Sequence, residues 1–87
     1  MTVIKRYKNR KLYSMDIAQY VTLGDIATMI RLNEDFMVIS NDTKRDITAI
    51  TYAETLVSEL RNSRLSLGIE GITKIKDLLQ SEMRVIV

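Results

Sequence analysis

The apolar residues of this chain follow two different periods, and the change between them limits the folds open to it. Up to residue 21 they fall in short β-favouring runs, such as Val3-Ile4 and Tyr20-Val21. Beyond that point they recur every three or four residues, beginning with Leu23, Ile26 and Ile30. Short strands followed mainly by helices predict an α+β domain, with about three helices packed on a small antiparallel sheet.

The expected strands are separated by polar turns. Lys8-Asn9 is such a turn, because Asn tolerates a positive φ better than most residues. Tyr20 and Phe36 stand between apolar neighbours and are assigned to the core. The strands are expected at residues 3–7, 10–13, 19–21 and 36–39, with residues 46–48 as a further short strand or a helix entry.

The expected helices each carry an apolar stripe. Thr22 and Asp25 form a capping box that begins the first helix, which Asn33 ends. A second helix is expected from about Ile50 to Arg61. Its buried face is predicted to be Ile50, Ala53, Val57 and Leu60, widened by Tyr52 and Leu56. A third is expected from about Ser66, as a core element or an oligomerisation helix, with the stripe Ile69, Ile72, Ile75, Leu79 and Met83.

The composition excludes several classes of function. The chain has 87 residues, enough for one domain, and it contains no Cys and no His. Disulfides, thiolate nucleophiles, imidazole bases and the usual zinc ligands are therefore absent, and no Gly-rich phosphate loop is present. We expect a binding protein with no catalytic site, cofactor or metal. No signal peptide or membrane-length apolar run is visible, so a soluble cytoplasmic protein is expected, with no membrane partner.

Positive charge is concentrated at the start of the chain. Residues 1–15 contain no acid and five cations, whereas the remaining residues hold eight Lys or Arg and eleven Asp or Glu. The cations are Lys5, Arg6, Lys8, Arg10 and Lys11. A basic block on an acidic body is typical of a protein that binds a polyanion. The alternative is a basic edge hairpin whose lysines prevent strand aggregation.

The residue types in this block suit DNA. Arg10 has the donor fork for guanine and Asn9 the amide for adenine. Tyr7 and Tyr13 can bond phosphate, stack on bases or pack. A strand through this block would place Lys5, Tyr7, Asn9 and Lys11 on one face and Arg6, Lys8 and Arg10 on the other. The predicted DNA contacts are Lys5, Arg6, Tyr7, Lys8, Asn9, Arg10, Lys11 and Tyr13.

Four ordered blocks of sequence resemble one known family. Residues 4–13, 20–26, 35–39 and 43–48 are similar to successive motifs of the polyhydroxyalkanoate (PHB/PHA) accumulation regulator, N-terminal DNA-binding domain. The resemblance implies a bacterial transcriptional regulator, typically a repressor of granule-associated proteins and of storage-polymer synthesis, whose members bind DNA and the polymer. Lys8 stands where the family commonly has Pro, and Lys44 stands where Gly is usual.

These observations give three hypotheses. The first is a homo-oligomeric DNA-binding repressor, with residues 1–62 as the DNA-binding domain and residues 63–87 as a C-terminal helix for packing or oligomerisation. The second is an interaction or scaffold module that binds a protein partner or a storage granule without binding DNA. The third is a receptor for a small anionic ligand such as a nucleotide.

Overall fold

Four short strands form one sheet in the order β3-β2-β1-β4. The computed structural model describes the backbone of residues 1–86 and the side chains of residues 1–81. The strands are β1 (Thr2–Arg6), β2 (Leu12–Ser14), β3 (Gln19–Val21) and β4 (Phe36–Ser40). The α+β class is confirmed, but a purely antiparallel sheet is not. β4 runs parallel to β1, because the chain crosses from β3 through a helix and returns along the far edge.

The core lies between one face of this sheet and two helices. Ile4, Leu12 and Val38 alternate inward from β1, β2 and β4 and are almost completely buried. Ile26 and Phe36 complete the buried cluster. Each such side chain contributes about 1.5–3 kcal/mol by leaving water, so five of them carry much of the stability of a chain this small.

Helix α1 (Leu23–Arg31) begins as its sequence predicts. The Thr22 side chain accepts a hydrogen bond from the Asp25 amide at 3.1 Å, and an Asp25 carboxylate oxygen accepts one from the Thr22 amide at 2.8 Å. This capping box satisfies two amides that the helix cannot pair itself. Asn33 adopts a left-handed φ of 56° just beyond the C-cap residue, Leu32, and so reverses the chain toward β4.

Helix α2 (Thr48–Arg61) turns inward a different face from the one predicted. Its buried residues are Thr51, Thr55 and Glu59. The predicted stripe faces outward instead, with Ile50 58% exposed and Val57 45% exposed. The Thr51 and Thr55 hydroxyls donate to the carbonyl oxygens four residues earlier, at 2.9 and 2.8 Å. Because these hydroxyls are satisfied within the helix, threonine can be buried here at little cost.

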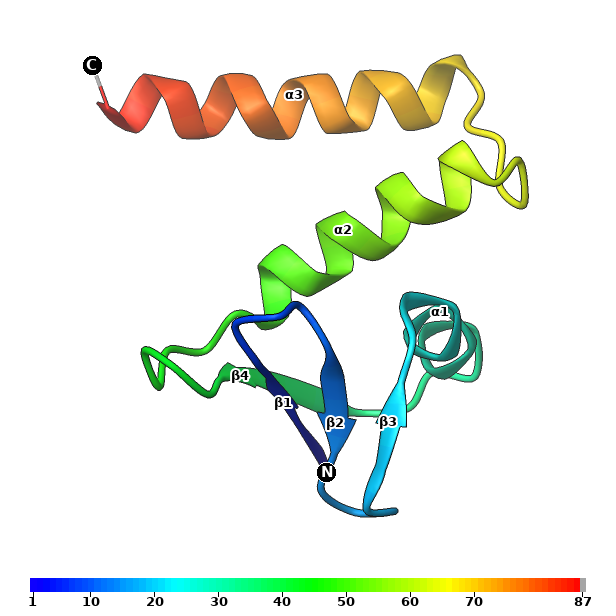
Figure 1. Cartoon of the computed structure of the whole chain (residues 1–87). Helices are drawn as coiled ribbons and strands as arrows, with labels where there is room; N and C mark the ends of the chain where they lie inside the picture. Colours follow the sequence, from blue (N-terminus) through cyan, green and yellow to red (C-terminus); the bar gives the residue numbers. More distant parts are fainter. Residues whose placement is uncertain (87) are drawn as a thin grey trace.

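Helix α3 (Ile69–Ile86) begins three residues later than expected and lies beyond α2, on the side away from the sheet (Figure 1). Much of its apolar surface is exposed, including Ile69 and Ile72. Among the residues described, no helix is long and apolar enough to cross a membrane.

No helix of the described residues covers the second face of the sheet (Figure 1). The strand periods place Tyr13 and Tyr20 there, directly opposite each other on β2 and β3. Tyr20 is 63% exposed, so its predicted place in the core is wrong. Its neighbour Val21 packs against the core in its stead, because adjacent residues of a strand point to opposite faces.

Candidate nucleic-acid interface

The basic segment forms the hairpin between β1 and β2. The Tyr7 amide donates to the Lys11 carbonyl at 3.0 Å, and the Arg10 amide donates to the Tyr7 carbonyl at 2.9 Å. Arg10 has a φ of 69°, so it lies in the turn and not in the predicted strand. The Asn9 side-chain oxygen accepts from the Lys11 amide at 3.1 Å. Lys8, Asn9 and Arg10 therefore form a three-residue tip with a left-handed last residue.

Arg6 is directed into the molecule. It follows Ile4 on the face that the helices cover, and its side chain is only 15% exposed. Its guanidinium donates to both carboxylate oxygens of Glu54 on α2, with Nη2 to Oε2 at 2.9 Å. This bidentate hydrogen bond from Arg6 holds the pKa of Glu54 below its ordinary value of 4.5, although partial burial opposes the shift. Arg6 thus ties the hairpin to α2.

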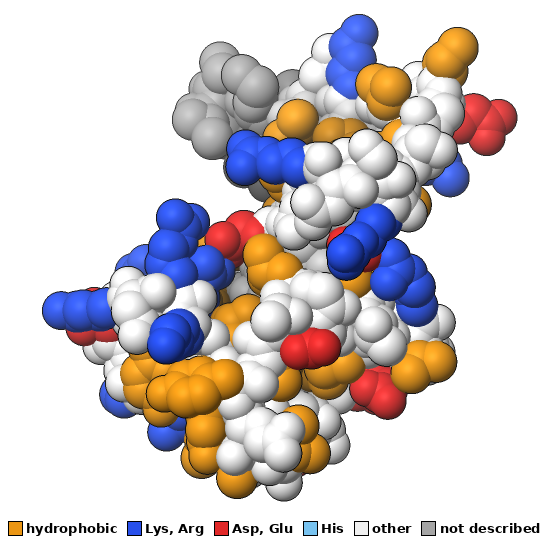
Figure 2. All heavy atoms as spheres, turned by 45° about the vertical axis from the view of Figure 1, so that its right-hand side comes forward, with side chains coloured by type: hydrophobic (Ala, Val, Ile, Leu, Met, Phe, Trp, Pro, Cys, Tyr) orange, Lys and Arg blue, Asp and Glu red, His pale blue; other side chains and the backbone are white. Residues whose placement is uncertain are grey.

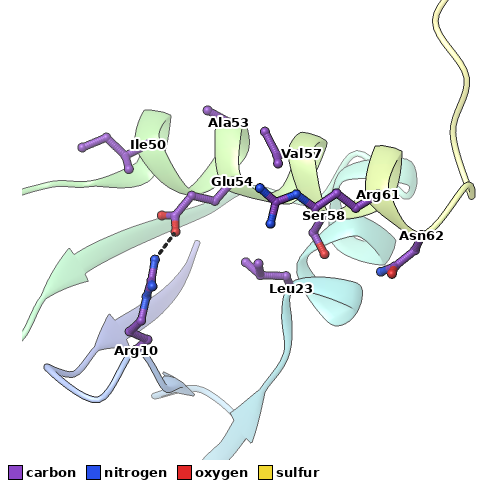
Figure 3. A pocket seen from close by; sticks show the side chains of 9 residues that line it. All are labelled: Arg10, Leu23, Ile50, Ala53, Glu54, Val57, Ser58, Arg61 and Asn62. Atoms are coloured by element: carbon purple, nitrogen blue, oxygen red, sulfur yellow. Dashed lines mark ion pairs between the residues drawn. The ribbon is translucent and has the colours of Figure 1, made fainter.

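Arg10 and Lys8 are exposed cations at the tip. Arg10 extends toward Glu54, with Nη2 3.8 Å from Oε2, yet its side chain is 81% exposed (Figure 3). Lys8 lies 3.5 Å from Asp42 and is 80% exposed. Exposed ion pairs of this kind contribute about 0–1 kcal/mol. Both cations can therefore leave their carboxylates for a phosphate at little cost.

The other predicted contacts lie on the helix-free face of the sheet or next to it. Lys5 stands directly opposite Tyr13 across the β1–β2 pair. The Lys11 ammonium lies 5.5 Å from the centre of the Tyr20 ring. Tyr7 is half-buried beside Asn9, in a shallow hollow that both residues line. Figure 2 shows Lys and Arg side chains gathered at the level of the hairpin, with hydrophobic surface beside them.

The eight predicted contacts thus divide into three groups. Lys8, Asn9 and Arg10 form the tip, and Arg6 is turned inward. Those on or beside the open sheet face are Lys5, Tyr7, Lys11 and Tyr13. One of the five cations is therefore held by a half-buried carboxylate, and four remain available to a polyanion.

Two residues of the interface region were not predicted from the sequence. Glu54 binds Arg6 across 48 positions of sequence, and no local pattern signals such a contact. Arg61, at the end of α2, points into the same hollow as Arg10, a space of about 550 Å³ between α2 and the hairpin (Figure 3). Only the tertiary fold brings Arg10 and Arg61 to one hollow.

The predicted oligomerisation residues share one side of α3. Ile69, Ile72 and Leu79 are largely exposed and Ile75 is partly so. The side chain of Met83 lies outside the described residues. Nothing in the described part of the chain covers this surface fully, which is the condition that an interface between copies requires.

Known proteins resemble about two thirds of this chain. An uncharacterized protein of Allochromatium vinosum is 30% identical over 57 residues, covering 66% of this chain and 37% of that protein. A Thiocystis violacea protein described as an uncharacterized protein in the phbA 5′ region is also 30% identical over 57 residues, covering 66% and 41% respectively. The chain thus spans about two fifths of the length of these relatives. No solved structure matches it.

The family comparison places the resemblance on the fold. The matched segment, residues 3–63, runs from β1 to just past the end of α2 and so contains the whole sheet and the basic hairpin. More than half of the chain is included, and the resemblance predicted from its four motifs is confirmed. The chain belongs to the PHB/PHA accumulation regulator DNA-binding domain family.

Proposed function

We propose that this chain binds duplex DNA as a transcriptional repressor in the cytoplasm, and that it is a binding protein and not an enzyme. The observation that carries the proposal is the outward projection of four cations from one hairpin and the adjoining sheet face. They are Lys5, Lys8, Arg10 and Lys11. Neutralising phosphates with such residues releases counterions, which drives association with DNA.

The shape of the hairpin suits a groove of the duplex. A two-stranded ribbon fits the major groove, where an arginine can donate two hydrogen bonds to a guanine edge. Arg10 is the residue of the tip with this donor fork, while Lys8 suits a phosphate. Arg6 and Glu54 have a supporting role, because their bidentate pair fixes the ribbon against α2 before DNA arrives.

The salt dependence of duplex binding tests this proposal. Four phosphate contacts per copy of the chain, at about −0.9 each, predict a slope near −3.6 per copy for log K against log salt, and a fifth contact from Arg6 would make it about −4.5 per copy. Replacing Lys8 and Arg10 by Ala should reduce the slope to about −1.8. A matched variant, Lys74→Ala with Lys76→Ala on α3, removes the same charge elsewhere and should leave the slope unchanged. Undetectable duplex binding at low salt would reject the proposal.

We further infer that a second copy of this chain covers the exposed helices. A largely apolar groove of about 600 Å³ runs between α3 and helices α1 and α2. Its apolar lining includes Ile30, Leu56, Ile75, Leu78 and Leu79. Such a groove resembles a helical core from which one helix is missing. Every copy of the chain carries an exposed apolar helix face of the kind that fills such a groove.

The outward stripe of α2 supports the same occupant. Ile50 and Val57 are exposed beside Arg10 along one hollow, so a copy docked there would bring its own hairpin close to the first. Oligomers usually bury self-complementary patches of this kind. An assembly with two hairpins would make twice as many phosphate contacts as a single copy of this small domain.

A further inference from the structure

The helix-free face of the sheet has an unusual composition for a surface that no helix covers. Strand period and register place six side chains on it: Val3, Lys5, Tyr13, Tyr20, Met37 and Ile39. None of these is acidic. Tyr20 is exposed and the other five are half-buried, but no helix of the described chain covers them. A sheet face left open in water normally carries mainly polar residues, whereas this one carries two tyrosines among aliphatic side chains.

One row crosses all four strands of this face. Ile39 stands opposite Lys5, Lys5 opposite Tyr13, and Tyr13 opposite Tyr20. Neighbouring strands lie about 4.8 Å apart, so the row is continuous. The two rings meet edge to face, with centres 5.2 Å apart and planes at 78°. Tyr20, at the exposed end of the row, offers the more accessible ring.

Positive charge accompanies the rings. Lys5 lies within the row and the Lys11 ammonium lies over the Tyr20 ring. Neither lysine forms an ion pair with a carboxylate in the described chain. Cations without acidic partners, placed beside exposed rings, are complementary to a polyanion that carries flat groups of its own.

We propose that this open face binds single-stranded nucleic acid. Bases stack on Tyr20 and Tyr13, and Lys5 and Lys11 hold the adjoining phosphates. A single strand supplies unstacked bases, whereas a duplex hides the faces of its bases inside the helix. The open face is therefore a second binding surface beside the hairpin tip. It shares Lys5 and Lys11 with the proposed duplex site, but Tyr13 and Tyr20 take part only in binding a single strand.

Binding of a dye-labelled oligothymidylate to the full chain, followed by fluorescence anisotropy, tests the proposal. Stacking on one aromatic side chain corresponds to about ten-fold in affinity, so Tyr20→Ala should weaken binding by about that factor. Tyr20→Phe keeps the ring and should bind as the parent does. An abasic oligomer of the same length keeps the phosphates alone. It should bind more weakly and should not respond to Tyr20→Ala.

Any of three binding results would overturn this inference: no binding of oligothymidylate at low salt, equal affinity for the abasic oligomer, or an unchanged affinity in Tyr20→Ala. Loss of self-association in Tyr20→Ala would instead assign the face to a protein contact and would also overturn it.

The variant with Lys8 and Arg10 replaced by Ala separates the two sites. Defective duplex binding with intact dependence on Tyr20 is expected if the rings, and not the hairpin tip, bind the bases, and loss of the Tyr20 dependence in this variant would contradict that division. Melting by circular dichroism verifies that each variant is folded.

Discussion

At the scale of single residues, the turns carry left-handed backbone where glycine would be the easiest choice. Arg10 has a φ of 69° and Lys44 a φ of 62°, and both are basic. A side chain with a Cβ in this region costs about 1–2 kcal/mol. At Arg10 the cost accompanies an exposed cation at the tip of the hairpin that we propose contacts DNA, and strain of this kind is usually retained at functional sites. At Lys44 the resemblance predicts Gly, and the left-handed backbone there is the geometry that glycine adopts most easily.

Replacing Lys44 by Gly should stabilise the chain. The substitution removes the left-handed strain but adds freedom to the unfolded chain, so the expected net gain in the free energy of unfolding is about 0.5–1 kcal/mol. The Lys44 amide keeps its hydrogen bond to the Ser40 carbonyl. Urea denaturation measures the gain. Lys44→Ala removes the same charge but keeps the strain, so an equal gain in that variant would show that charge and not backbone geometry limits stability.

At the scale of elements, the Arg6–Glu54 pair joins β1 to α2. The guanidinium and the carboxylate are mostly shielded from water, and each carboxylate oxygen accepts a hydrogen bond. Charge-assisted bonds in this setting are stronger than exposed ion pairs, at about 2 kcal/mol. The pair therefore fixes the base of the hairpin, while Lys8 and Arg10 at its tip remain largely exposed to water.

Glu54→Gln should lower the free energy of unfolding by about 2 kcal/mol at neutral pH. The pKa of Glu54 is lowered in the folded state, mainly by the hydrogen bond from Arg6. Its contribution is therefore complete above the unfolded value of about 4.5 and is lost as the pH falls through the folded value. The difference between parent and variant should shrink across that acidic window, as measured by urea denaturation at several pH values.

Two further groups help to interpret that experiment. A hydrogen bond from the Thr48 side chain lowers the pKa of Asp46, so parent and variant both lose stability from Asp46 as the pH falls. Only the difference between them reports on Glu54. Glu70→Gln, at an exposed position of α3, should show no such difference. A gap between Glu54→Gln and the parent that stays constant at acidic pH would mean that the carboxylate charge is not what holds the hairpin.

At the scale of the whole molecule, α2 and α3 expose apolar surface of the kind that a protein partner usually covers. If that partner is a second copy, the melting temperature should rise with protein concentration and sedimentation should show a dimer or larger oligomer. Ile72→Lys with Leu79→Lys should abolish both effects, because each places a charge in the apolar contact. Ser81→Lys, on the opposite side of α3, should leave self-association intact.

A monomer at all concentrations would contradict the inferred self-association. The parent chain could instead capture an unrelated protein without self-associating. If Ile72→Lys with Leu79→Lys abolishes that capture, the surface belongs to a heterologous partner. Retained binding to a storage-granule surface under the same conditions would favour the scaffold hypothesis.

The sequence by itself determined the local structure. The capping box of α1, the inward alternation of Ile4 and Val38 and the hairpin at Lys8–Arg10 all follow from interactions between residues close together in the chain. Such features depend on backbone propensities and on side-chain period, which short patterns encode. The family and the basic character of the hairpin were predictable for the same reason.

Only the tertiary structure decided which faces are buried. Helix α2 carries two stripes of equal period, and packing against the sheet selected Thr51 and Thr55 over Ile50 and Val57. It likewise left Tyr20 in solvent and paired Arg6 with Glu54. These outcomes depend on contacts between residues far apart in the sequence. A periodic pattern gives the direction of each side chain around its own element, but not what lies opposite it.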